Sequence, residues 1–257
     1  MGRRTRILLV LGLATGTAGA QAQTATPGPF RISLEPSYFT GRFGAAHGFR
    51  IYNLPLAIIY RENLLRVRIE IPYVAVAGAG LLSGGTVLRD RQSTALRRGL
   101  GDAWISAQYR VLPGQGLTPS IRPLIKIKIP FASRTRGLGT GRVDGELGTR
   151  FSWRVGTRIF PYAEIGYRLN GRAHGLRLRN AVTYQLGASI ALAQQQYLTA
   201  VFIGHSAFQY HVRPTDSIVA AYNVTLSPIW GLEAYVDRGL TANSPSVGLG
   251  FGVTAGF

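Results

Sequence analysis

Charged side chains recur at every second position in two stretches of the chain. One is LRVRIEIPY, from Leu65 to Tyr73, and the other is LIKIKIP, from Leu124 to Pro130. Guanidinium and ammonium groups bind carboxylates and phosphates, and rings of Arg and Lys favour anions in pores. Such chemistry requires an element that gathers the charged groups on one surface.

A β-strand is the element that does so. Strict alternation puts Arg66, Arg68 and Glu70 on one face of a strand and the aliphatic residues between them on the other. The same pattern places Lys126 and Lys128 on one face of the second stretch.

The pattern continues along the chain, with connections that are short and long in turn. The alternating segments are 30–39, 50–60, 65–74, 103–112, 118–129, 145–154, 159–169, 181–191, 197–205, 217–226, 232–238 and 246–257. Tight turns alternating with longer loops are typical of membrane barrels. We predict an all-β fold for residues 23–257, a transmembrane antiparallel up-and-down β-barrel of about 12 strands. The longest connection, 75–102, is rich in glycine and is predicted to fold inward as a constriction.

The amino terminus predicts export. Residues 1–22 combine a basic start (Arg3, Arg4 and Arg6), an apolar core over 7–14 and small residues before Ala22. This is the pattern of a cleaved signal peptide, whose apolar core is too short to span a bilayer. Together with a barrel, it predicts the outer membrane of a Gram-negative bacterium. The chain contains no Cys, which excludes disulfides and Cys-based metal sites.

The formal charge of +18 raises the question of a nucleic-acid partner. The basic residues are spread along alternating strands instead of being clustered on a helix or tail, so we predict no nucleic-acid binding. In a membrane barrel the aliphatic faces contact lipid and the polar faces line the lumen. The basic loop residues Arg134, Arg136, Arg172, Arg177 and Arg179 would suit contacts with lipopolysaccharide phosphates.

The last segment, VGLGFGVTAGF, alternates apolar residues with small ones and ends on an aromatic residue, Phe257. A terminal aromatic residue on an alternating strand resembles the signal that the outer-membrane assembly machinery reads. We therefore predict that Phe257 is the assembly signal.

The polar faces of the clearest strands give the predicted pore lining. It consists of Arg66, Arg68, Glu70, Arg110, Arg122, Lys126, Lys128, Glu146, Arg150, Arg154, Glu164 and Arg168. A basic lining favours anionic or carboxylated small-molecule solutes. The alternative is that these charges pair into a structural plug that keeps a narrow barrel closed.

Two segments carry a family resemblance. GLGDAWISAQYRV (Gly99 to Val111) and KIKIPFASRTRGLGTGRVD (Lys126 to Asp144), followed by the glycine-rich terminus, resemble the outer-membrane proteins of the meta-pathway of phenol degradation family. The resemblance implies a channel or transporter, with aromatic compounds as solutes of some members.

Other chemistry has little support in the sequence. His205 and Ser206 are neighbours on a predicted strand, so they point to opposite faces and cannot form a catalytic dyad. We predict no enzyme, no cofactor and no metal site. Two alternatives to the channel remain: a closed structural or adhesive barrel, and, with less support, a lipid-modifying outer-membrane enzyme.

Overall fold

The computed structural model describes residues 7–10, 19–22, 28–45, 48–78, 80–83, 86–88, 95–210 and 212–257. The predicted signal peptide, 1–22, lies mostly outside these residues. Its described parts are β1 (Ile7–Val10) and β2 (Gly19–Ala22), which pair with each other. Within the described residues there is no helix that is both long and apolar enough to cross a membrane.

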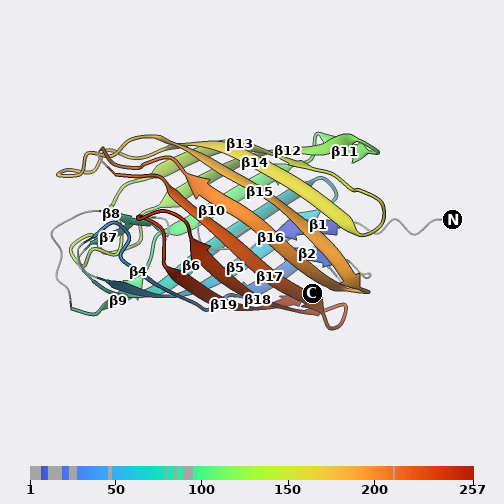
Figure 1. Ribbon diagram of the computed structural model, residues 1–257, viewed down its shortest axis with the longest axis horizontal. Helices are drawn as coiled ribbons and strands as arrows, with labels where there is room; N and C mark the ends of the chain where they lie inside the picture. The colour runs from blue at the N-terminus through green and yellow to red at the C-terminus, as the bar shows by residue number, and fades with distance from the viewer. Residues whose placement is uncertain are drawn as a thin grey trace.

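Twelve antiparallel strands form a closed barrel, which confirms the predicted fold class (Figure 1). In chain order they are β3 (Phe30–Leu34) with β4 (Ser37–Gly41), β5 (Phe49–Glu62), β6 (Leu65–Ala77), β9 (Arg97–Leu100) with β10 (Ala103–Tyr109), β12 (Thr118–Ile129), β13 (Asp144–Ser152), β14 (Ile159–Leu169), β15 (Ala181–Ala193), β16 (Gln196–His205), β17 (Thr215–Thr225), β18 (Trp230–Gly239) and β19 (Val247–Gly256). The ring closes because β19 pairs with both β3 and β4. Closure leaves no strand edge without a hydrogen-bonding partner.

Two of the twelve strands are interrupted. The first breaks at Glu35 and Pro36, and the fourth breaks at Gly101 and Asp102. The sequence pattern placed 97–102 in the longest loop, but β9 pairs with β6 and extends the fourth strand back to Arg97. Gly101 fits this break because a Cβ there would lie 2.8 Å from the ring of Pro72.

The barrel has a short-turn end and a long-loop end. The tight turns use residues with positive φ, among them Asn63 (44°) and Gln195 (63°), as two-residue hairpins require. Both ends of the barrel segment lie at the short-turn end, where the Phe257 N–H donates to the carbonyl of Phe30 at 3.0 Å. β11 (Leu112–Gln115) pairs with β12 and projects from this end as a hairpin (Figure 1).

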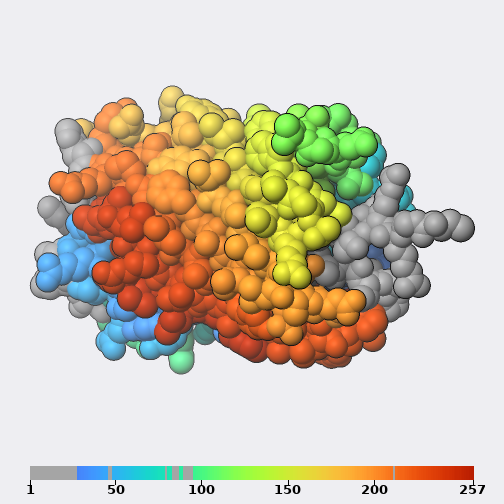
Figure 2. All heavy atoms as spheres, turned by 45° about the vertical axis from the view of Figure 1, so that its right-hand side comes forward, coloured from blue at the N-terminus to red at the C-terminus, as the bar shows by residue number. Residues whose placement is uncertain are grey.

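The two faces of the wall differ as the alternation predicts. On β6, Leu65 and Ile69 are 39% and 42% exposed, whereas Arg66 and Arg68 are 6% and 4% exposed. In Figure 2 the side chains of the later strands, drawn in orange and red, cover much of the face of the barrel toward the viewer. An aliphatic outer face around a charged interior is the arrangement that a bilayer selects, because a charge near the hydrocarbon midplane costs about 2–4 kcal/mol.

Candidate functional site

A ladder of ion pairs crosses the inner face of β12, β13 and β14. Lys126 Nζ lies 2.7 Å from Glu146 Oε1 and 3.2 Å from Glu164 Oε1. Glu146 also binds Arg168 Nη2 at 2.8 Å, and Glu164 binds Arg150. We call these five residues the paired ladder. The antiparallel register produces it, since Lys126, Glu146 and Arg168 are direct cross-strand neighbours.

Two further groups of charges flank the paired ladder. Arg68 binds Glu70 at 2.6 Å and Glu35 at 3.3 Å, and Glu35 lies at the break in the first strand. Lys128, which is fully buried, binds Asp144 at 2.6 Å and Asp102 at 3.2 Å. The acids that pair with these bases therefore come partly from the two strand interruptions, which the sequence pattern did not predict.

The remaining predicted lining residues lie toward the short-turn end. Arg66 and Arg122 are buried on β6 and β12. Arg110 follows the end of β10 and donates to the carbonyl of Asn63 at 3.2 Å. Arg154 follows the end of β13, is exposed, and its guanidinium lies 5.6 Å from the centre of the Phe160 ring. Arg110 and Arg154 thus belong to the rim and not to the strands themselves.

The opposite wall, from β15 to β19, has a different composition. Arg238 is the only Lys or Arg in these five strands, and it is exposed. The inner face carries glycines, such as Gly248 and Gly250, and small polar residues, such as Ser189 and Thr199. We call this the glycine-rich wall, and the inner face from β6 to β14 the charged wall.

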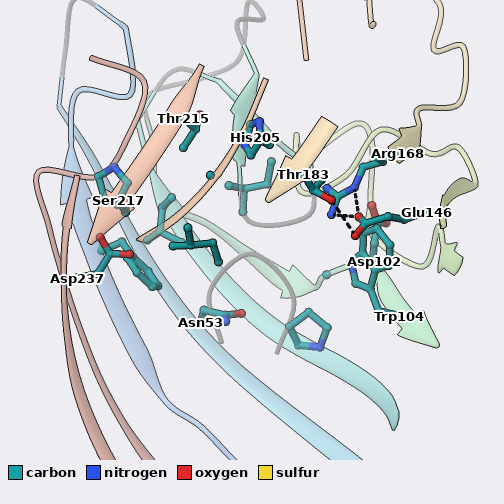
Figure 3. A pocket seen from close by; sticks show the side chains of 18 of the residues that line it. Asn53, Asp102, Trp104, Glu146, Arg168, Thr183, His205, Thr215, Ser217 and Asp237 are labelled. Carbon is teal, nitrogen blue, oxygen red and sulfur yellow. Dashed lines mark hydrogen bonds and ion pairs between the residues drawn. The ribbon is translucent and has the colours of Figure 1, made fainter. Parts of the chain in front are cut away.

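A pocket lies between the two walls in the half of the barrel nearer the long loops (Figure 3). Asp237 and Ser217 stand on one side of it, across from Arg168 and Glu146. Its lining extends from Leu82, in the longest loop, to residues of the paired ladder. Apolar side chains supply much of the remaining lining: Phe39, Phe43, Ile51, Val74, Trp104 and Leu138. The pocket therefore offers both aromatic or aliphatic contacts and hydrogen-bonding groups.

Arg168 is held in place by aromatic rings as well as by Glu146. Its guanidinium lies 4.9 Å from the Trp104 ring centre and 5.2 Å from that of Phe208. The Phe208 ring stacks on His205 with centroids 3.8 Å apart and an interplanar angle of 4°. These ring contacts restrict the movement of the Arg168 side chain. Phe208 comes from a long loop, and no sequence pattern marked it.

The described part of the longest loop packs into the barrel at the long-loop end, where Leu82 and Val87 join the main buried cluster. Its hairpin of β7 (Leu81–Ser83) and β8 (Thr86–Leu88), the inner hairpin, buries Leu81 and Leu88 against Phe208. Arg97 fastens the base of this hairpin. Its guanidinium donates to the carbonyl of Gly78 at 2.5 Å and to that of Gly80 at 2.9 Å.

The side chains of His205 and Ser206 form no dyad. The Ser206 hydroxyl accepts a hydrogen bond from the backbone N–H of Val182 at 3.0 Å, while the His205 ring stacks on Phe208. Among the described residues, no group of three or more His, Asp or Glu side chains is arranged to hold a metal ion.

Comparison with solved structures finds a similar fold in several outer-membrane channels and porins. An outer membrane channel from Pseudomonas putida F1 aligns with a TM-score of 0.68 and 12% identity over 91% of this chain and 97% of that chain. The NanC porin aligns with a TM-score of 0.56 and 10% identity over 88% and 98% of the two chains. The CymD monoaromatic hydrocarbon channel gives 0.52 and 11% over 90% and 89%. At this identity the likeness shows the fold alone. No family model and no curated protein matches the sequence.

Proposed function

We propose that the protein is an outer-membrane channel for small solutes in a Gram-negative bacterium. The observation that carries the proposal is the pocket, whose lining runs from the inner hairpin at the long-loop end to the paired ladder. The exposed aliphatic outer face and the channels with the same fold support a place in the outer membrane. The long loops would then face outward and the short turns the periplasm.

We infer that the solutes are small aromatic or anionic compounds. Phe39, Phe43 and Trp104 offer aromatic contacts in the pocket, and arginines continue along the charged wall beyond it. An aromatic ring that bears a carboxylate combines both chemistries. This class agrees with the resemblance to the meta-pathway of phenol degradation family.

Conductance of the mature protein in a planar bilayer tests the proposal. Arg97→Gln should raise the conductance or its open fraction, because it removes the donors that hold the base of the inner hairpin to the barrel. Arg98→Gln is the matched control, since the neighbouring Arg98 side chain is exposed. The channel proposal fails if neither the wild type nor the Arg97 variant conducts.

The paired ladder supports one other candidate, a closed structural barrel. Buried charges that pair with one another hold strands together and can fill a narrow lumen. A protein that inserts and is heat-modifiable on gels, but does not conduct when Arg97 is replaced, would be such a barrel.

A further inference from the structure

Five arginines lie near one another at the short-turn end of the barrel, where the charged wall meets β5 and β3. Arg31, Arg61, Arg66, Arg122 and Arg150 come from β3, β5, β6, β12 and β13, and we call them the arginine cluster. Two pairs of them face each other directly, because Arg61 is the cross-strand partner of Arg66 and Arg122 is the partner of Arg150. Like charges in directly opposed positions destabilise a sheet.

The protein leaves part of this charge without a counter-ion. The Nε, Nη1 and Nη2 atoms of Arg61 are inaccessible to solvent and have no hydrogen-bond partner among the described residues. Arg122 takes part in none of the ion pairs in the described part of the chain. Arg150 binds Glu164 through Nε at 2.8 Å, but its Nη1 has no hydrogen-bond partner in the described part of the chain.

Acidic residues of the described part of the chain already have other partners. Glu70, Glu146 and Glu164 are taken up by Arg68 and the paired ladder. Glu62 lies at the short-turn end, but it is exposed and accepts a hydrogen bond from the Tyr60 hydroxyl. Residues 1–27 contain no Asp or Glu, so this segment has no side-chain carboxylate to offer.

We propose that the arginine cluster is a binding site for a phosphate group, either inorganic phosphate or a phosphate monoester. The planar guanidinium fork binds a phosphate through two parallel N–H···O bonds, and one dianion can serve arginines from both opposed pairs. The anion relieves the repulsion within Arg61–Arg66 and within Arg122–Arg150 and satisfies the free nitrogens of Arg61 and Arg150. The inference deepens the proposed function and rests on it for the route by which the anion arrives.

Thermal unfolding and calorimetry of the mature protein in detergent test the site without any need for conductance. Sodium phosphate should raise the unfolding temperature above that in sodium chloride of equal ionic strength, and calorimetry should detect binding. The double variant Arg61→Gln with Arg122→Gln should bind phosphate at least about tenfold more weakly, because it removes charge-assisted hydrogen bonds from both opposed pairs.

The matched control removes the same charge at the opposite end of the barrel, through Arg172→Gln with Arg177→Gln, two exposed loop residues. This control should bind phosphate like the wild type. In sodium chloride the double variant Arg61→Gln with Arg122→Gln should unfold at a higher temperature than the wild type, because the repulsion between the arginines is reduced. A measured unfolding transition also shows that the variant folds. Equal stability of the wild type in the two salts, or unchanged binding by the cluster variant, would overturn the proposal. A non-conducting barrel that binds phosphate would refute the channel but not this site.

Discussion

The charged wall and the glycine-rich wall fill the interior of the barrel in different ways. The charged wall fills the interior with long side chains whose charges compensate one another, as Lys126 does with Glu146 and Glu164. The glycine-rich wall fills it by close approach, since a Cβ on Gly187 would lie 2.5 Å from Val201 Cγ2 and 2.7 Å from the carbonyl oxygen of Ala200. The charged wall depends on electrostatic pairing, whereas the glycine-rich wall depends on close contacts at its glycines.

The difference also divides the interior by charge pairing. The pocket lies between the two walls, so its lining has the ion-paired Glu146 and Arg168 on one side and Ser217 and Asp237 on the other (Figure 3). Fixed pairs present little net charge. The guanidinium nitrogens of Arg61 and the Nη1 of Arg150, which have no hydrogen-bond partner among the described residues, lie further along, in the arginine cluster.

The largest expected effect comes from breaking the paired ladder. Glu146→Gln should destabilise the barrel by about 3–5 kcal/mol, because it removes the shared partner of Lys126 and Arg168 and leaves buried charge uncompensated. Equilibrium unfolding in urea, followed by intrinsic tryptophan fluorescence, measures this change.

Asp237→Asn on the glycine-rich wall is the matched control for the ladder. Asp237 is also buried, but it takes part in no ion pair among the described residues. Its replacement should change the free energy of unfolding by less than about 1 kcal/mol, because Asn has the same shape as Asp and no buried ion pair is broken. Equal losses in the two variants would show that the walls do not differ in their dependence on charge pairing.

A smaller effect is expected from adding a methyl group to the glycine-rich wall. Gly187→Ala should cost about 1–3 kcal/mol, because the new Cβ meets backbone that cannot move away. Gly145→Ala, on the outer face of β13, should be neutral, since a Cβ there meets nothing within 4 Å. The same urea titration compares the two variants.

The smallest effect concerns ion preference. Arg122→Gln should lower the ratio of anion to cation permeability by less than about tenfold, because the other arginines of the cluster remain. The reversal potential in a salt gradient measures this ratio. Thr199→Ala, a buried polar change on the glycine-rich wall, should leave the ratio unchanged. A shift of equal size in both variants would assign the selectivity to something other than the charged wall.

The deletion of Phe257 separates assembly from stability. Phe257 is 54% exposed and lies just beyond β19, where its N–H donates to the Phe30 carbonyl. Its removal should lower the amount of barrel inserted in cells, because the terminal aromatic residue is the predicted assembly signal. The fraction that is inserted should unfold at nearly the same urea concentration as the wild type. Full insertion of the shortened chain would contradict this role.

The sequence by itself determined the strand number and the facing of the side chains. A period of two is a local property of an extended chain, so Arg66 and Arg68 had to share a face whatever their partners. The alternation of tight turns and long loops likewise implied an up-and-down order. The charged face of each strand had to point into the barrel, because a charge in the hydrocarbon of the bilayer is unfavourable. This conclusion requires no knowledge of which residues are in contact.

Only the tertiary structure decided which charges meet. The register between β12 and β13 decides whether Lys126 lies opposite Glu146 or one residue away. The same register places Arg122 opposite Arg150. The interruptions at Glu35 and Asp102, which supply acids to Arg68 and Lys128, arise from pairing between strands distant in the sequence. Closure then brings β19 against β3, and the long loops place Phe208 against Arg168. Contacts of this kind depend on the relative positions of segments far apart in the chain, which no local pattern encodes.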